Sequence, residues 1–334
     1  SSSLVPSVVH FDVFGNPEVG QGAKRFLETD PANTIFSAKR LMGKSYKDVS
    51  QSARYFTYKV IDDNTDALVK VQVGSSFYSP TDLSSFILAE LKKRAEHILK
   101  TPVTKAVITV PAYFNDAQRQ ATRDAGKLAG LDVLRIVDEP TAASLAYGLG
   151  LQKDEETTIA VYDLGGGTFD ISILKITDGV FDVLSTNGDT YLGGDDIDRA
   201  IIDYWLAQKS IDIKVLQNNP NLLQTIRLSA EEAKKALSSS DQFETTIDGQ
   251  VYQISKSVFE GLITTIIGKT IDCCKNALAD AKLNAGQIDS IVMVGGSTRI
   301  PAVKAAVAAF FGKRSFKVSL TRFPICCLTV TPCL

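Results

Sequence analysis

The chain has 334 residues, of which 44% are hydrophobic and 22% charged, and this composition fits a globular protein of two or three domains. Its formal net charge of −2 lacks the basic excess that binding to nucleic acid or to an anionic membrane requires, so we predict neither partner. No apolar run reaches the roughly 18 residues that span a bilayer, and five cysteines without a CxxC spacing argue against a disulfide framework or a zinc site. We therefore expect a cytoplasmic protein.

Helix and strand signals alternate through the first half of the chain, as in α/β proteins. A polar run over 152–156 then predicts a boundary between two α/β lobes. The expected elements are a helix over 81–100, a strand over 106–110, a helix from Asn115 or Asp116 to about Ala129, a strand over 131–137, and a helix led by Pro140 through 141–147.

The second half continues the alternation around glycine-rich turns. We expect a hairpin of strands 158–163 and 169–174, and later a strand over 291–294 followed by a helix led by Pro301. Between them we expect helices over 195–208, over 229–238 with Ser229 and Glu232 as its capping box, and over 258–283.

The most informative motif is DLGGGTFD at 163–170. Gly165, Gly166 and Gly167 follow a strand and let backbone amides approach an oxyanion, and Thr168 adds a hydroxyl donor. Asp163 puts a carboxylate where a phosphate-bound Mg²⁺ and its waters would lie. These features favour a phosphate-binding turn, while an ordinary hairpin turn is the alternative.

A second glycine pair lies between a strand and a helix in VGGSTRIP at 294–301. Gly295 and Gly296 would let backbone approach a ligand closely, and Arg299 offers a flat guanidinium able to pack on a base. A solvated Arg299 at a helix start is the alternative reading.

The third candidate is a helix face. Glu231, Lys234 and Ser238 are spaced so that they share one helix face and can contact one ligand. A solvated face with an ion pair between Glu231 and Lys235 is the alternative, and without other context it is the favoured one.

Three charged residues are candidates for catalysis. Lys39 and Arg40 follow an apolar segment, and Glu139 follows an apolar strand and begins a helix. None is specific alone, because surface lysines and helix-start carboxylates are common structural features.

Together the motifs resemble one family. They are DLGGGTFD at 163–170, VGGSTRIP at 294–301, TVPAYFNDAQRQAT at 109–122, DEPTAASLAYGL at 138–149 and GDTYLGGDDID at 188–198. In this order they resemble the ATPase domain of the 70-kilodalton heat-shock chaperones (DnaK type) from about Pro6 to Lys313. Finer features, such as PSVVH at 6–10 and RLMG at 40–43, are similar to the HscA type that serves iron–sulfur cluster assembly.

The resemblance implies an actin-like α/β fold, with two lobes around a central nucleotide cleft that holds Mg²⁺ and ATP or ADP. The glycine turn 165–167 and Thr168 would hold the β and γ phosphates, and Asp163 the water shell of Mg²⁺. Lys39 would orient the attacking water, with Glu139 contributing on the same side. Phosphoryl transfer depends mainly on positioning and charge, which suits such a distributed set of residues.

The resemblance also assigns the nucleoside side and a relay. Pro111 and Arg119 match the pair that carries nucleotide state toward the partner domain. Glu231 and Lys234 would contact ribose. The residues implied in contacts with adenine or around the nucleotide are Gly194, Lys235, Ser238, Gly295, Gly296, Ser297 and Arg299.

The sequence departs from the family pattern in three places. Residues 1–152 are expected to form lobe I, yet no segment before Pro6 resembles the family's first strand and phosphate loop. Residues 153–313 are expected to form lobe II, and residues 314–334 read as an atypical tail rich in cysteine. Because the first phosphate loop is missing from the pattern, hydrolysis by this chain alone stays open. No peptide-binding domain is expected within these residues, so we do not expect this chain alone to hold a client by the family's usual means.

Three functions therefore compete. The leading one is a chaperone ATPase whose nucleotide state controls client binding, with a J-domain co-chaperone and a client protein, an iron–sulfur scaffold in the HscA case, as partners. The second is a nucleotide-binding module without turnover. The third is another actin-like protein, such as a sugar kinase or a filament former, because these share the fold.

Overall fold

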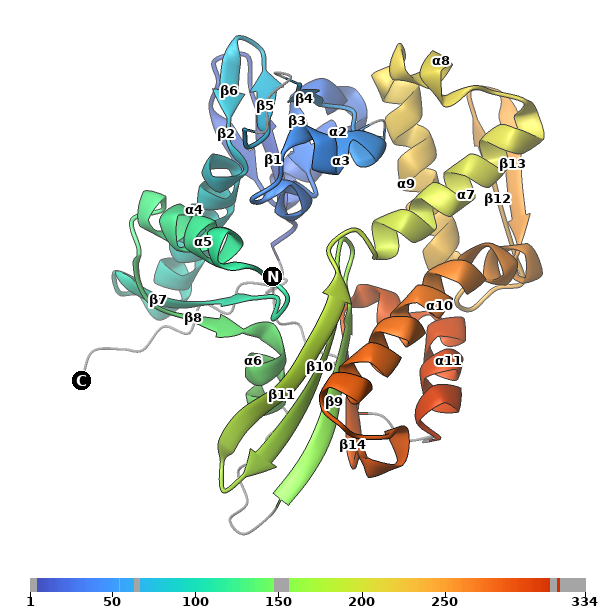
Figure 1. Ribbon diagram of the computed structural model, residues 1–334. Helices are drawn as coiled ribbons and strands as arrows, with labels where there is room; N and C mark the ends of the chain where they lie inside the picture. The colour runs from blue at the N-terminus through green and yellow to red at the C-terminus, as the bar shows by residue number, and fades with distance from the viewer. Residues whose placement is uncertain (1–4, 54, 63–66, 147–155, 313–316, 319–334) are drawn as a thin grey trace.

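Figure 1 shows the chain as a mixed α/β protein in a computed structural model. The residues described are 5–53, 55–62, 67–146, 156–312 and 317–318. We call 5–146 the N-terminal half and 156–312 the C-terminal half. The expected boundary between 152 and 153, and all of the expected tail except 317–318, lie outside the described residues.

The N-terminal half contains three small sheets. Two are antiparallel, with strand orders β2-β1-β3 and β4-β5-β6, and the third is the parallel pair β7-β8. The strands are β1 (Val8–Phe11), β2 (Pro17–Val19), β3 (Thr34–Phe36), β4 (Lys59–Ile61), β5 (Lys70–Val73), β6 (Ser76–Tyr78), β7 (Lys105–Val110) and β8 (Asp132–Asp138). The strands predicted over 106–110 and 131–137 are confirmed as β7 and β8.

The long helices of this half begin at side-chain caps. Ser79 and Asp82 form a capping box at the start of α4, and Asn115 and Gln118 do the same for α5, which confirms both predicted helices. The helices are α1 (Gln21–Lys24), α2 (Phe26–Thr29), α3 (Tyr46–Ala53), α4 (Pro80–Leu99), α5 (Asp116–Leu128) and α6 (Glu139–Ala146), with 3₁₀ turns η1 (Pro31–Asn33) and η2 (Ala38–Leu41).

The C-terminal half is built on a sheet of strand order β11-β10-β9-β14-β15. The strands β9, β10 and β11 form an antiparallel meander, whereas β14 runs parallel to β9 and to β15. The predicted hairpin and the strand over 291–294 are confirmed. The strands are β9 (Glu156–Leu164), β10 (Phe169–Thr177), β11 (Val180–Asp189), β14 (Ser290–Val294) and β15 (Lys317–Val318).

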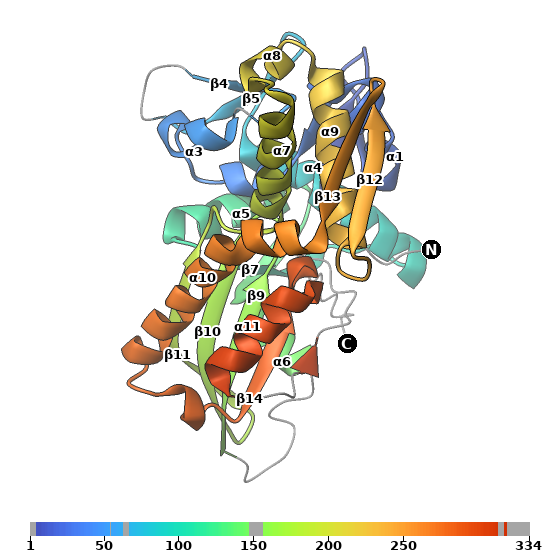
Figure 2. The ribbon, with the colours of Figure 1, turned by 90° about the vertical axis from the view of Figure 1, so that its right-hand side faces the viewer.

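Helices and one hairpin complete this half. Figure 2 shows α10 and α11 across one face of the sheet, and α7 and α9 beside the hairpin β12–β13. The elements are α7 (Gly194–Lys209), α8 (Ile213–Gln217), α9 (Pro220–Ala236), β12 (Gln242–Ile247), β13 (Gln250–Ser255), α10 (Lys256–Asp280), η3 (Ala285–Gln287), η4 (Gly296–Arg299) and α11 (Pro301–Phe311).

The predicted start of the third motif helix is wrong. Helix α9 begins at Pro220 with Asn219 as its N-cap, so Ser229 lies inside the helix and is buried, and it caps nothing. The spacing of Ser229 and Glu232 fits a capping box, but the apolar residues before it already continue the helical pattern. Ser238 lies just past the helix end at Ala236.

The described residues form four clusters of buried apolar side chains, and the two largest lie in different halves. The larger core surrounds Trp205 between the sheet and α7, α9 and α10, and the smaller one lies among β1, β3, β5 and α4. Tyr191 and Leu228 belong to the C-terminal half but pack against the smaller core. The loop between β11 and α7 thus lies where the two halves meet (Figure 1).

Candidate active site

The glycine turn, residues 165–168, joins β9 to β10. The Gly165 amide donates to the carbonyl oxygen of Thr168 at 3.1 Å, which closes the turn. Within the described part of the chain, the amides of Gly166 and Gly167 donate no hydrogen bond to a protein acceptor. The turn therefore offers two open backbone donors, as an anion-binding turn requires.

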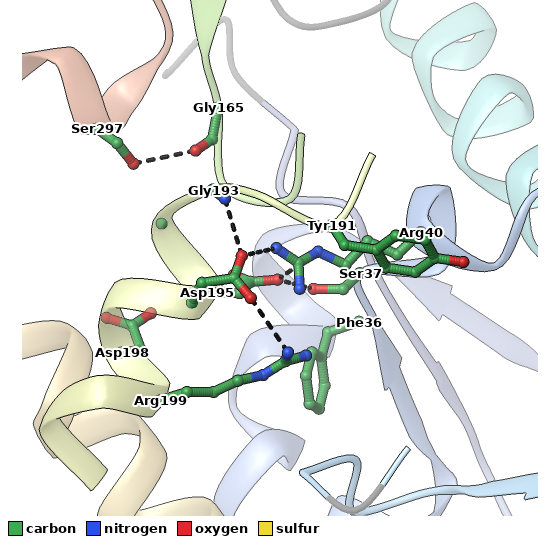
Figure 3. Close-up of polar contacts among 12 residues, drawn as sticks. Phe36, Ser37, Arg40, Gly165, Tyr191, Gly193, Asp195, Asp198, Arg199 and Ser297 are labelled. Carbon is green, nitrogen blue, oxygen red and sulfur yellow. Dashed lines mark hydrogen bonds and ion pairs between the residues drawn. The ribbon is translucent and has the colours of Figure 1, made fainter. Parts of the chain in front are cut away.

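Elements α7 and η4 hold the carbonyl groups of this turn. The carbonyl oxygen of Gly165 accepts a hydrogen bond from Oγ of Ser297 at 3.0 Å (Figure 3). It also accepts one from the Gly194 amide at 3.0 Å. The carbonyl oxygen of Gly166 accepts from the Asp195 amide at 2.7 Å. The predicted residues Gly194 and Ser297 thus contact the turn directly.

The predicted catalytic charges meet beside the turn. Lys39 Nζ donates to Oε1 of Glu139 at 3.2 Å across segments far apart in the chain. Asp163 at the end of β9 is the register partner of Asp170 in β10, and Oδ1 of Asp170 accepts from the Tyr113 amide at 3.3 Å. One ammonium group therefore faces three carboxyl groups.

This surplus of acidic groups shifts their titration. Burial and the nearby Glu139 carboxylate raise the pKa of Asp163 to about 8 and that of Asp170 to about 7. Burial alone would lower the pKa of Lys39, but the carboxylates of Glu139, Asp170 and Asp163 outweigh it and hold the pKa above its usual value. The lysine stays charged, and the two aspartates lack enough positive charge around them.

The donor set fits a Mg²⁺ ion that binds mainly through water and phosphate. A hard divalent cation prefers carboxylate oxygens and keeps several waters, and it would relieve the excess negative charge at Asp163. Among the described residues, no group of three or more His, Cys, Asp or Glu side chains is arranged to hold a metal by itself. Such an ion would therefore need ligand oxygens besides those of the protein.

A second lysine cluster lies on the other side of the turn. Lys234 Nζ donates to Oδ2 of Asp198 at 2.9 Å and to the Gly194 carbonyl at 3.2 Å. Asp198 is 3% exposed, and burial raises its pKa to about 6 against the opposing effect of Lys234. Ser238 reaches this cluster only through its hydrogen bond to the Lys234 carbonyl oxygen.

Three of the predicted adenosine contacts lie outside that cluster. Lys235 forms an ion pair with Glu231 along α9, which is the alternative the sequence left open. Arg299 is exposed at the end of η4, and no hydrogen bond or ion pair among the described residues joins it to Lys235 or Ser238. The structure thus brings Lys234, but not the whole predicted set, up to the turn.

Gly295 packs against the end of β9, beside Asp163. Its φ of +90° is unfavourable for other residues, and a Cβ atom there would lie 2.2 Å from the Leu164 carbonyl oxygen and 2.7 Å from Oδ1 of Asp163. Gly296 has open space around it. The first glycine is therefore required by packing against β9, and the second leaves room for a ligand.

Arg119 joins the loop that follows Pro111 to Asp138, the residue before Glu139. Its guanidinium donates to the carbonyl oxygens of Ala112 and Phe114 at 3.0 and 2.9 Å, and it lies 2.7 Å from Oδ1 of Asp138. The neighbouring amide of the same loop binds Asp170. A shift of this loop would therefore reach the active site directly.

Asp170 was not among the site residues predicted from the sequence. It lies within the strongest motif, but only its partner Asp163 was assigned a role. A hairpin that closes on residues 165–168 must place Asp163 opposite Asp170, so strand register was the signal that could have found it.

These features define a nucleotide-binding domain of actin-like ATPase fold, with a glycine turn next to a Lys–Glu pair and buried aspartates. A family described as Hsp70 protein matches residues 1–320, most of the chain. The chain belongs to the Hsp70 family, whose members are ATPases that act as chaperones. The match extends past Lys313, where the resemblance was expected to end, and 317–318 form β15 beside β14. No helix in the described ranges is both long and apolar enough to cross a membrane.

Proposed function

We propose that this chain binds ATP and ADP with Mg²⁺ and hydrolyses ATP at the glycine turn. The observation that carries the proposal is the meeting of Lys39 and Glu139 with the buried Asp163 and Asp170 beside a turn with open amides. A phosphoryl-transfer site needs this combination of anion donors, a fixed cation and carboxylates.

The protein's part in the reaction follows from this geometry. The amides of Gly166 and Gly167 and the hydroxyl of Thr168 bind phosphate oxygens. Mg²⁺, when bound near Asp163, neutralises phosphate charge. Lys39, held by Glu139, orients the attacking water and stabilises charge in the transition state.

The nucleoside side is proposed to set affinity. Lys234 and Gly194 lie against the turn, so ribose would bind beside them, with Glu231 at the next position of the same helix face. Gly296 and Arg299 would approach the base. The remaining residues of this proposed set are Lys235, Ser238, Gly295 and Ser297.

The wider role is proposed from the family. Lobe I would be residues 1–152 and lobe II residues 153–313, with their relative position set by the bound nucleotide. In the chaperone that state would control client binding, assisted by a J-domain co-chaperone. We propose a cytoplasmic location, and an iron–sulfur scaffold as client if the HscA-like features hold.

The test combines calorimetry with single-turnover hydrolysis. We expect the chain to bind ADP and ATP at one site in the presence of Mg²⁺ and to release phosphate from ATP. Lys24→Ala, an exposed lysine of α1, is the control and leaves both measurements unchanged. Stoichiometric ADP binding without phosphate release selects the non-hydrolysing module. ADP formation that depends on added glucose selects a sugar kinase, and no binding at all refutes the proposal.

A further inference from the structure

Arg40 is a buried cation that crosses between the two halves of the molecule. Its side chain is 1% exposed, and Nη2 donates to Oδ2 of Asp196 at 2.6 Å while Nε lies 3.5 Å from Oδ2 of Asp195 (Figure 3). In the described residues, Nε and Nη1 have no hydrogen-bond partner. A guanidinium is costly to bury with donors unused, so its retention calls for an explanation.

Ser37, the residue before η2, also contacts the start of helix α7. Its hydroxyl donates to Oδ2 of Asp195 at 2.8 Å, and its φ of +54° is a left-handed conformation that is strained for serine. The Arg40 amide donates to the Ser37 carbonyl oxygen at 3.0 Å. Lys39 therefore lies in a turn that is anchored to Asp195 at both ends.

The start of α7 also touches the glycine turn. The amide of Asp195 binds the Gly166 carbonyl oxygen, while its carboxylate faces Ser37 and Arg40. A Cβ atom on Gly167 would lie 2.9 Å from Nε of Arg40, so the guanidinium rests against the third glycine. Asp195 thus connects two elements, because its backbone amide binds the glycine turn and its carboxylate binds the η2 segment.

We propose that Ser37, Arg40, Asp195 and Asp196 form an η2–α7 clamp that positions Lys39 relative to the glycine turn and couples that position to phosphate binding. Arg40 is the positioning residue of the clamp. A phosphate on the turn moves the carbonyl groups that α7 holds, and the clamp carries the displacement to the residue next to Lys39. This proposal rests on the proposed function, and it explains how Lys39 is positioned for catalysis.

A purely structural bridge explains less. A bridge that only joins the halves needs neither a strained Ser37 nor unused donors beside the turn. Arg199 already lies 3.1 Å from Oδ1 of Asp196 on α7 itself, so that carboxylate has a partner without Arg40. Arg40, which connects the two halves, is also the direct sequence neighbour of Lys39.

The experiment compares Arg40→Gln and Asp195→Asn with Arg25→Gln, an exposed arginine that pairs with Glu18 at the surface. Asp195→Asn keeps the shape of a side chain that is only partly buried, so it preserves the test if Arg40→Gln folds poorly. We expect both clamp variants to lower the single-turnover rate about tenfold or more, while the Kd for ADP changes less than about threefold. In a Lys39→Ala background, Arg40→Gln should cost less than about twofold further, because the clamp acts through Lys39.

Hydrogen exchange gives a readout that does not depend on turnover. In the wild-type chain, Mg²⁺, ADP and inorganic phosphate should slow exchange of the amides over 38–42, and both clamp variants should lose most of that slowing while Arg25→Gln keeps it. Equal slowing in all four proteins overturns the clamp and leaves the proposed function intact. A full rate loss from Arg40→Gln in the Lys39→Ala background also overturns it. If the wild-type chain binds no ADP, the proposed function falls and the clamp falls with it.

Discussion

Two lysines approach the glycine turn from opposite sides, and their surroundings differ. Lys39 meets three carboxyl groups drawn from distant segments, and burial raises the pKa of Asp163 to about 8 and of Asp170 to about 7. Lys234 meets one carboxylate, Asp198, from a neighbouring helix. The Lys39 cluster contains two aspartates whose pKa is raised to about 8 and about 7, whereas the Lys234–Asp198 pair joins one cation to one hydrogen-bonded carboxyl group whose pKa is raised only to about 6.

The difference indicates that the two clusters have different roles. A cluster with unbalanced charge interacts strongly with groups whose charge changes during a reaction, because fixed charges in a buried site act without reorganising. A balanced pair contributes mainly shape and hydrogen bonds, which bind ground state and transition state alike. We therefore expect changes near Lys39 to alter turnover, and changes near Lys234 to alter affinity or stability.

Replacing Lys39 should have the largest effect. Lys39→Ala removes the cation that faces Glu139, Asp163 and Asp170, so we expect single-turnover hydrolysis to fall on the order of 10² to 10³-fold, or roughly 3 to 4 kcal/mol. The Kd for ADP should change less than about threefold, because the proposed role lies in the transition state. Lys24→Ala serves as the control. An unchanged hydrolysis rate would remove Lys39 from the catalytic assignment.

The close packing of the η4 segment against the end of β9 is tested at Gly295. Gly295→Ala forces a side chain onto a φ of +90° and against the Leu164 carbonyl oxygen, so we expect the free energy of unfolding to fall by about 3 kcal/mol. Gly261→Ala, on an exposed part of α10 with open space around it, should instead stabilise the chain by about 0.5 to 1 kcal/mol. Denaturant unfolding of both variants measures the contrast. Equal stability of the two would show that β9 and η4 can separate at no cost.

The Lys234 cluster predicts a pH dependence of stability. Burial raises the pKa of Asp198 to about 6 in the folded chain, and Lys234, Asp195 and Glu231 are the charged groups facing it. A raised carboxyl pKa means that the folded state keeps its proton where the unfolded state has lost it. The contribution of Asp198 to stability is therefore complete below about pH 4 and is lost as pH rises to about 6.

Asp198→Asn isolates this contribution. Between about pH 4 and 6.5, wild-type stability should fall relative to the variant by about 3 kcal/mol, and the difference should be constant above that range. Asp182→Asn, an exposed residue of β11, should show no such change. Urea unfolding across the pH series is the measurement. A difference between wild type and Asp198→Asn that does not vary with pH contradicts the raised pKa.

Local patterns predicted the elements but not the contacts between them. The Asn115 cap of α5 and the hairpin around the glycine turn follow from neighbouring residues, and both were predicted. Helix α4 was predicted from its apolar periodicity, without the capping box of Ser79 and Asp82. Ser229 was misjudged because a capping pattern also occurs inside helices when the preceding residues are helical. The strands of the first two sheets are three or four residues long, too short for an alternation to stand out.

The site was predicted in part for a similar reason. Lys39, Glu139 and Gly194 were among the residues predicted from the sequence, and the structure brings all three close to the turn, while their roles stay predictions. The bonds from Ser37 and Arg40 to α7 span more than 150 positions, and no local pattern encodes a pairing at that distance. Asp198 was missed because its role depends on burial against α9, which only packing determines.

The smallest expected effect concerns Lys235, an exposed residue of α9 next to Lys234. Its side chain is 64% exposed and pairs with Glu231 one helical turn away, so Lys235→Ala should change the free energy of unfolding by less than about 0.5 kcal/mol. If Lys235 also contacts adenine, the same variant should weaken ADP binding about threefold to tenfold and leave the single-turnover rate at saturating ATP unchanged. Calorimetry and unfolding on one preparation separate the two roles. Lys275→Ala, an exposed lysine paired with Asp272 on α10, provides the matched ion-pair control. An ADP affinity equal to that of wild type would leave Lys235 as a surface ion-pair partner alone, because the structure itself shows only its contact with Glu231.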